Sequence, residues 1–200
     1  MDNEMDFSDL REIAGEVYSP IVVKHIFHGL IDGSFKDIRN SEIVLSMGFS
    51  QDGTADLHVC GDDNGVAYME GSLPVDLIYN PKFFEILGGA FAHEMSHIAR
   101  GDHRMGELRA ALYDGAQNGI ESVIKDLPSV SNVDNARVFA LGVHAKIERS
   151  TDMDAMLRGE GENIFYVRKY LEALYRMQGL EVHEGYFRSK KIAEIIRKEH

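Results

Sequence analysis

The stretch Phe91-Ala92-His93-Glu94-Met95-Ser96-His97 is the part of the chain around which the fold is expected to be organised. It has the form H-E-x-x-H, and on a helix His93 and His97 share one face, one turn apart. Two imidazole nitrogens presented in this way can hold one Zn²⁺ ion. Glu94 beside them is placed to accept a proton from an attacking water molecule. The alternative is a pair of core histidines without a metal.

The flanking residues predict a long, buried helix. Asn80 can cap it, Pro81 suits the first helical position, and Gly101 can end it. Between these residues two apolar stripes recur at helical spacing. The first consists of Phe83, Ile86, Ala90, His93 and His97, and the second of Phe84, Leu87, Phe91, Met95 and Ile98. A helix with two such stripes is buried on much of its surface, so both histidines are expected to point inward.

Length and charge narrow the class of protein. A chain of 200 residues suits a single domain, here residues 1–200, with its own core. The 33 acidic residues against 21 basic ones give a net charge of -12, which argues against nucleic acid as a partner because phosphate contacts need a basic surface. Cys60 is the single cysteine, so no internal disulfide can form, which suits a cytoplasmic location. No secretory signal and no apolar run of about 18 residues is present, so no membrane insertion is expected.

The segment from residue 41 to residue 79 has the alternation of strands. Turn signals separate its pieces at Gln51-Asp52-Gly53 and Asp63-Asn64-Gly65. The expected strands are Ile43–Phe49, Ala55–Val59 and Val66–Glu70, and Val75–Tyr79 can add a fourth. We expect a small antiparallel meander that leads directly into the H-E-x-x-H helix.

The remainder of the chain is predicted to be helical. Helices are expected over residues 8–32, Met105–Tyr113, 132–157, Ile164–Met177 and Tyr186–Lys198. The first can consist of one or two pieces, and the third follows a capping box at Ser131 and Asp134. The predicted fold class is therefore α+β, mainly helical, with a small antiparallel sheet before the H-E-x-x-H helix.

A catalytic zinc ion has three protein ligands and an open position, so a third ligand is required. One face of the helix over residues 132–157 carries Leu141, His144, Glu148, Asp152 and Ala155. Glu148 is the expected third ligand. Asp152, one turn further on, can accept the free N–H of His93 or His97 and fix the orientation of that ring. The alternative is a solvated acidic face, which the basic residues nearby favour.

The pair of motifs resembles a known class of enzymes. H-E-x-x-H followed by a helical E-x-x-x-D, here Glu148-Arg149-Ser150-Thr151-Asp152, is similar to the gluzincin class of zinc metallopeptidases. Ile98-Ala99-Arg100-Gly101-Asp102 also resembles small soluble bacterial gluzincins. The resemblance implies a zincin-like fold with zinc ligands His93, His97 and Glu148, a catalytic base Glu94 and an orienting Asp152. It further implies a sheet whose edge strand pairs with an extended peptide substrate.

His103 is a rival third ligand. It lies six residues after His97, where the metzincin pattern H-E-x-x-H-x-x-G-x-x-H has its last histidine. Arg100 occupies the position at which that pattern needs glycine, and the glycine comes one residue late. Met153 or Met156 can imitate the methionine turn of that class, although both lie in a helical pattern. Glu148 is therefore preferred and His103 stays open.

The function expected from these residues is that of a zinc-dependent endopeptidase acting on a peptide or protein substrate, with Glu94 as general base. A hydrogen-bond donor must stabilise the oxyanion of the transition state. The candidate donors are His144, Tyr166, Tyr175, His183 and Tyr186, among which the sequence does not choose. The alternatives are a zinc-binding regulatory or interaction protein with a metallopeptidase-like site, and a helical protein with chance histidines.

Overall fold

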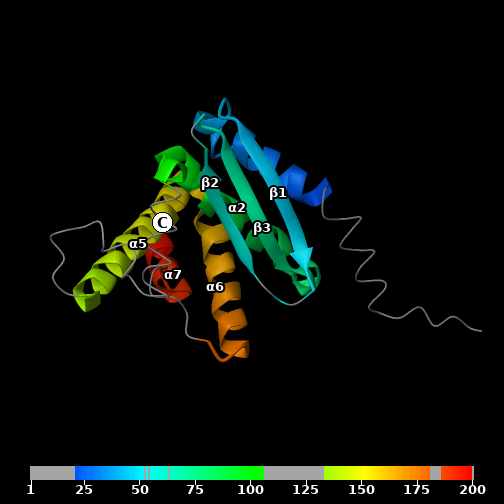
Figure 1. Ribbon diagram of the computed structural model, residues 1–200. Helices are drawn as coiled ribbons and strands as arrows, with labels where there is room; N and C mark the ends of the chain where they lie inside the picture. Colours follow the sequence, from blue (N-terminus) through cyan, green and yellow to red (C-terminus); the bar gives the residue numbers. More distant parts are fainter. Residues whose placement is uncertain are drawn as a thin grey trace, which may run out of the picture.

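A three-stranded sheet with helices packed on one face positions the H-E-x-x-H helix (Figure 1). The computed structural model describes residues 21–51, 53, 55–62, 64–105, 133–180 and 186–199. After a helix over residues 21–32, the elements are η1 (Lys36–Ile38), β1 (Ile43–Ser50), β2 (Asp56–Gly61), β3 (Ala67–Pro74), η2 (Val75–Tyr79), α2 (Phe83–Arg100), η3 (Asp102–Met105), α5 (Val133–Ala155), η4 (Met156–Glu160), α6 (Gly161–Met177) and α7 (Ser189–Glu199). The predicted α+β class, mainly helical with a small sheet, is confirmed.

The pairing of the strands differs from the predicted antiparallel meander. β2 and β3 are antiparallel neighbours, but β3 also pairs in parallel with β1, so the strand order is β1-β3-β2. The alternation of the sequence specifies strands and faces, and it does not specify which strand lies in the middle. The five residues 51–55 between β1 and β2 can span the two strand spacings, about 10 Å, that separate the edges. β3 is the strand with the most buried side chains, and it takes the central position.

The predicted fourth strand is a short 3₁₀ helix, η2. The ladder between β1 and β3 ends at the pair Ser50–Pro74, so the residues that follow have no neighbouring strand to pair with. Val75 and Leu77 are instead buried by the turn of η2, which redirects the chain into α2.

α2 runs through the centre of the protein, as the two apolar stripes predict. Every residue from Ile86 to Ile98 is buried. The side chain of Asn80 accepts a hydrogen bond from the backbone N–H of Lys82 at 2.9 Å, and the helix begins at Phe83. Gly101 ends the helix in the left-handed conformation, with φ at 77°, as predicted.

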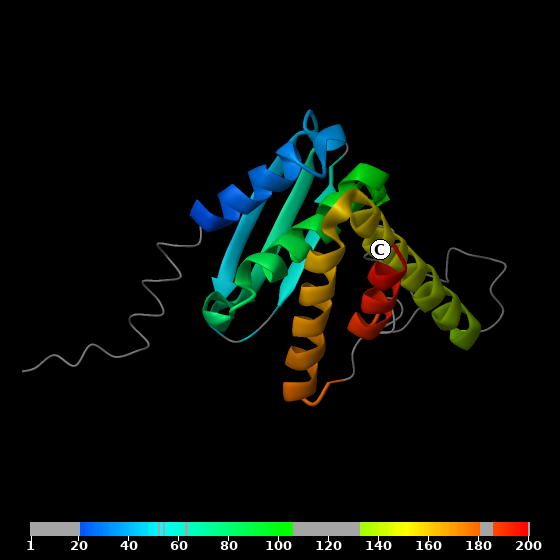
Figure 2. The ribbon, with the colours of Figure 1, turned by 180° about the vertical axis from the view of Figure 1, so that it is seen from behind.

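Helices pack on both sides of α2. The helix over residues 21–32 lies with α2 on the rear face of the sheet, and Phe27 contacts Phe91 edge to face (Figure 2). α6 approaches α2 closely because α2 has glycine at positions 88 and 89. A Cβ atom at Gly89 would lie 2.2 Å from the backbone oxygen of Asn163 in α6. This close approach brings α6 beside the histidines of α2.

Some predicted features fall outside the described residues: residues 8–20, most of the helix expected at Met105–Tyr113, Ser131 and His183. The helix expected over residues 8–32 is present from residue 21, and the helix expected over residues 132–157 from residue 133. The helix expected at Ile164–Met177 is present, and the last helix begins at Ser189, three residues later than expected. In the described parts of the chain, no helix is both long and apolar enough to cross a bilayer.

Candidate metal centre and cleft

Three buried side chains from two helices converge on one point. Nε2 of His93 lies 2.9 Å, and Nε2 of His97 3.5 Å, from the same carboxylate oxygen of Glu148. Ligands that stand about 2.1 Å from a tetrahedral ion are about 3.4 Å from one another, so this spacing suits a shared metal ion. Within the described residues, His93, His97 and Glu148 form a group that can hold a metal, as the helical spacing and the E-x-x-x-D segment predict.

The other nitrogen of His93 has a fixed partner. Nδ1 of His93 lies 2.9 Å from Oδ1 of Asp152, which is fully buried. Arg168 of α6 donates two hydrogen bonds to that carboxylate, at 2.7 and 3.2 Å. Asp152 was predicted to contact either His93 or His97, and in the structure it contacts His93.

His97 is oriented by a different carboxylate. Because Gly101 turns the chain back at the end of α2, the side chain of Asp102 returns to His97, with its Oδ2 3.1 Å from Nδ1. The hydroxyl of Thr151 lies 3.2 Å from the same nitrogen. Both rings therefore bond through Nδ1 on one side and present Nε2 to Glu148 on the other.

The ionisation of the centre follows from its hydrogen bonds. Burial and the charge of Arg168 both lower the pKa of His93, but hydrogen bonds to the carboxylates of Asp152 and Glu148 outweigh them and raise it to about 9. Burial raises the pKa of Glu148, yet its bonds to His93 and His97 hold it well below the usual range. The two carboxylates thus favour the protonated form of the His93 ring.

Glu94 borders the metal group and is differently placed. Its side chain is 8% exposed, one carboxylate oxygen is 4.0 Å from Nε2 of His93, and the other has no hydrogen-bond partner among the described residues. A buried carboxylate oxygen without a partner costs free energy unless water or a ligand reaches it. The position suits a group that binds and deprotonates water.

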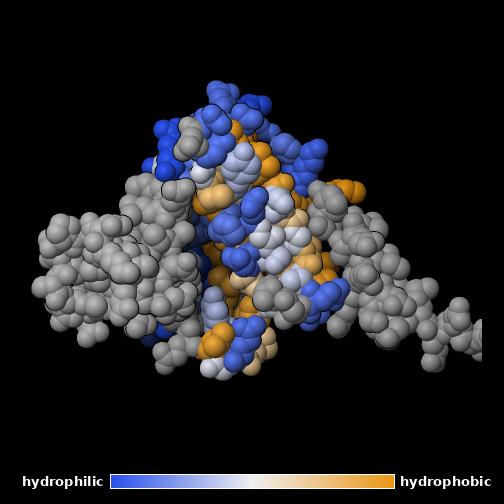
Figure 3. All heavy atoms as spheres, in the orientation of Figure 1, coloured by the Kyte–Doolittle hydropathy of each residue, from blue (hydrophilic) through white to orange (hydrophobic). Residues whose placement is uncertain are grey.

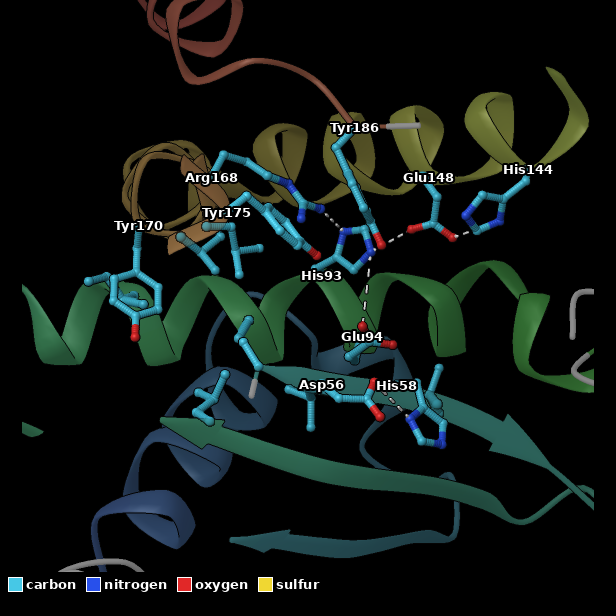
Figure 4. A pocket seen from close by; sticks show the side chains of 18 of the residues that line it. Asp56, His58, His93, Glu94, His144, Glu148, Arg168, Tyr170, Tyr175 and Tyr186 are labelled. Carbon is cyan, nitrogen blue, oxygen red and sulfur yellow. Dashed lines mark hydrogen bonds and ion pairs between the residues drawn. The ribbon is translucent and has the colours of Figure 1, made fainter. Parts of the chain in front are cut away.

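A cleft of about 800 Å³ opens onto these residues. Figure 4 shows it between α2, α5 and α6 on one side and β2 on the other. One part is apolar, with side chains that include Ile86, Ala90, Val167 and Leu171. β2 is an edge strand, and its residues Asp56 to Cys60 all line the cleft.

The predicted oxyanion donors lie at different distances from the centre. Tyr186 lies beside the centre, with its ring edge-on to His93 at 5.8 Å and against the guanidinium of Arg168 at 3.9 Å (Figure 4). Tyr175 lines the cleft as well, and His144 lies one turn before Glu148, with a ring nitrogen 3.7 Å from its carboxylate. Tyr166 does not line the cleft. Its ring lies at the start of α2, 4.5 Å from the ammonium of Lys82.

His103 lies outside the group of potential ligands. The turn at Gly101 carries it into η3, where its side chain packs near Gly61 of β2 and hydrogen-bonds the backbone of His97. Met153 and Met156, which the metzincin pattern would need in a turn, lie in α5 and η4.

Two residues of the centre, Asp102 and Arg168, were not predicted from the sequence. The glycine at position 101 was a usable signal for Asp102, because a left-handed end of a helix folds the next residues back onto its last turn. Arg168 is one of several basic residues on an amphipathic helix, and no local pattern distinguishes it from the solvated ones.

Comparison with known proteins adds no relative. No protein-family model, no curated protein and no solved structure matches the chain.

Proposed function

We propose that the protein is a zinc-dependent endopeptidase of the gluzincin type. The observation that supports this most is the convergence of His93, His97 and Glu148 in a cleft that also holds the unpartnered carboxylate oxygen of Glu94. A structural ion has no need of a base or of a cleft, whereas peptide hydrolysis needs both.

Zinc is the proposed metal because of the donor set. Two imidazole nitrogens and one carboxylate are the ligands of many catalytic zinc sites, and each histidine here has a carboxylate at its other nitrogen. A zinc ion in such a site lowers the pKa of water toward 7 and polarises a carbonyl group. His93 and Glu148 line the cleft, so an ion held by the three side chains would be reached from it.

Glu94 and Tyr186 are assigned the proton transfer and the stabilisation of charge. Glu94 would accept a proton from the attacking water and pass it to the leaving amine. Burial and the charge of Glu148 raise the pKa of Tyr186 well above its ordinary value, so its hydroxyl keeps its proton at neutral pH. That hydroxyl is directed toward the metal group and would donate a hydrogen bond to the oxyanion (Figure 4).

The free edge of β2 is the proposed site for the peptide backbone. Asp62 donates its N–H to Val66, so by alternation residues 60, 58 and 56 point their backbone groups at β3. The backbone groups of Leu57 and Val59 consequently point to the open edge beside the cleft, whereas the end of the strand at Gly61 packs against His103. An extended peptide can add there as an antiparallel strand.

Casein, which is unstructured, is a suitable first substrate. We expect the zinc-loaded protein to cleave it, a chelator to stop the reaction, and zinc to restore it. Glu94→Gln should keep its zinc and lose activity by about 10²-fold or more, since general base catalysis contributes that much. Glu85→Gln, at the third residue of the same helix, where the carboxylate pairs with Lys82, is the matched control. Cleavage by Glu94→Gln at the wild-type rate would contradict the mechanism, and zinc binding without any cleavage would favour a regulatory protein.

A further inference from the structure

We propose that Asp56 selects substrates that carry a lysine or arginine directly opposite it on the added strand. The inference rests on the proposed function and names one feature of the substrate. It depends on the register of β2, on the charges of the sheet and on the cleft that β2 borders.

The side chains of β2 alternate between two faces of the sheet. Val59 is 4% exposed and packs in the core, whereas the side chains of Asp56 and His58 are 72% and 54% exposed. Figure 4 shows Asp56 and His58 on the strand that borders the cleft, and their side chains lie 3.5 Å apart. Asp56 therefore stands on the outer face of the sheet, at the border of the cleft.

The backbone pattern fixes what would face Asp56. Its backbone groups point toward β3, so a strand added at the free edge meets it as a non-hydrogen-bonded pair. In such a pair the Cα atoms are about 4.5 Å apart and the two side chains lie on the same face, in contact. One substrate side chain is thereby placed against the Asp56 carboxylate.

The outer face offers negative charge at this position. None of the three strands contains lysine or arginine, and Asp56 is paired on β3 with Ser72, while His58 is paired with Glu70. Hydrophilic residues gather over the middle of this face in Figure 3. A cross-strand pair of opposite charges is favourable, and it can strengthen the binding of the added strand by up to about fivefold. A pair of like charges is unfavourable.

The position of Asp56 beside the cleft distinguishes it from other exposed acidic residues. The buried Glu94 oxygen that lacks a partner lies in the same cleft as Asp56, so the strand edge and the reacting centre face one space. The alternative role for Asp56 is to prevent the edge strand from pairing with other protein molecules. In that role it would give no preference among substrates.

Cleavage-site profiling on a synthetic library of unstructured peptides tests the inference. The zinc-loaded wild type, Asp56→Lys and Asp56→Ala would be compared with Asp32→Lys, which alters another exposed aspartate, one that pairs with Arg39. We expect the wild type to enrich lysine and arginine up to about fivefold at one fixed distance from the cleaved bond. Asp56→Ala should remove this preference, Asp56→Lys should turn it toward aspartate and glutamate, and Asp32→Lys should leave it unchanged.

Cleavage by the wild type without a charge preference, or a preference that persists in Asp56→Lys, would overturn the inference and leave the peptidase proposal standing. Absence of any cleavage by the wild type would contradict the proposed function, and the inference with it.

Discussion

Nδ1 of His93 lies 2.9 Å from a carboxylate oxygen of Asp152, and the same carboxylate is held by two hydrogen bonds from Arg168. All three side chains are buried. The bond leaves the opposite nitrogen of His93 directed at Glu148, so the orientation of one metal-facing ring depends on a residue that does not face the metal position itself.

Replacing Asp152 should therefore weaken metal binding. Asp152→Asn keeps the shape but removes the charge that fixes the His93 ring and neutralises Arg168, and we expect zinc affinity to fall by about 10- to 100-fold. Competition with a chromophoric chelator measures it. Asp154→Asn, two residues along α5 where the carboxylate pairs with Arg158, is the control and should bind zinc as the wild type does. Equal affinities for both variants would contradict this role of Asp152.

Zinc affinity should depend steeply on pH. The His93 pKa of about 9 means that the metal-free ring holds a second proton throughout the neutral range. A histidine that binds a metal must be the neutral imidazole, so zinc displaces that proton, and the apparent affinity should rise about tenfold per pH unit up to pH 9 and then level off. Titration calorimetry in two buffers of different ionisation enthalpy counts the released proton. Affinity that is flat between pH 7 and pH 9 would show that His93 is already neutral.

Two of the three tyrosines predicted as oxyanion donors should differ in their effect on activity. Tyr186→Phe removes a hydroxyl directed at the metal group, and kcat should fall on the order of 10²-fold with zinc content unchanged. Tyr166→Phe removes a hydroxyl beside Lys82, away from the cleft, and serves as the control with near wild-type kcat. The assignment would be wrong if Tyr186→Phe retained full activity.

Much of this centre was predictable because its residues lie in strong local patterns. His93, Glu94 and His97 lie within about one turn of a helix whose apolar stripes and terminal Gly101 mark it clearly. Glu148 and Asp152 follow from their four-residue spacing on a second helix. Both segments are short, and their side chains are placed by the helix alone.

What the sequence did not reveal depends on tertiary arrangement. β3 has the most buried side chains and lies in the middle of the sheet, a strand order that no alternation encodes. Arg168 reaches Asp152 only because two glycines of α2 admit α6 at close range. Tyr166 and Tyr186 are equivalent as residue types, and the packing of α6 and of the segment before α7 separates them.

The glycine contact between α2 and α6 can be tested by stability. Alanine normally favours a helix by about 1 kcal/mol over glycine, but at Gly89 its Cβ would lie 2.2 Å from the backbone of Asn163. We expect Gly89→Ala to destabilise the protein by about 1–3 kcal/mol, as overpacking does. Gly142→Ala in α5, where nothing lies within 4 Å, should instead raise the free energy of unfolding by up to about 1 kcal/mol. Chemical denaturation measures both, and a stabilising Gly89→Ala would contradict the close packing.

Plasma mass spectrometry of metal content tests whether one ion is held between α2 and α5. The untagged wild type, Glu148→Ala and the exposed control Glu162→Ala would be purified side by side. The arrangement of His93, His97 and Glu148 predicts near-stoichiometric zinc in the wild type and in Glu162→Ala, and a clear loss in Glu148→Ala. Zinc retained in Glu148→Ala, or absent from the wild type purified with zinc present, would contradict it.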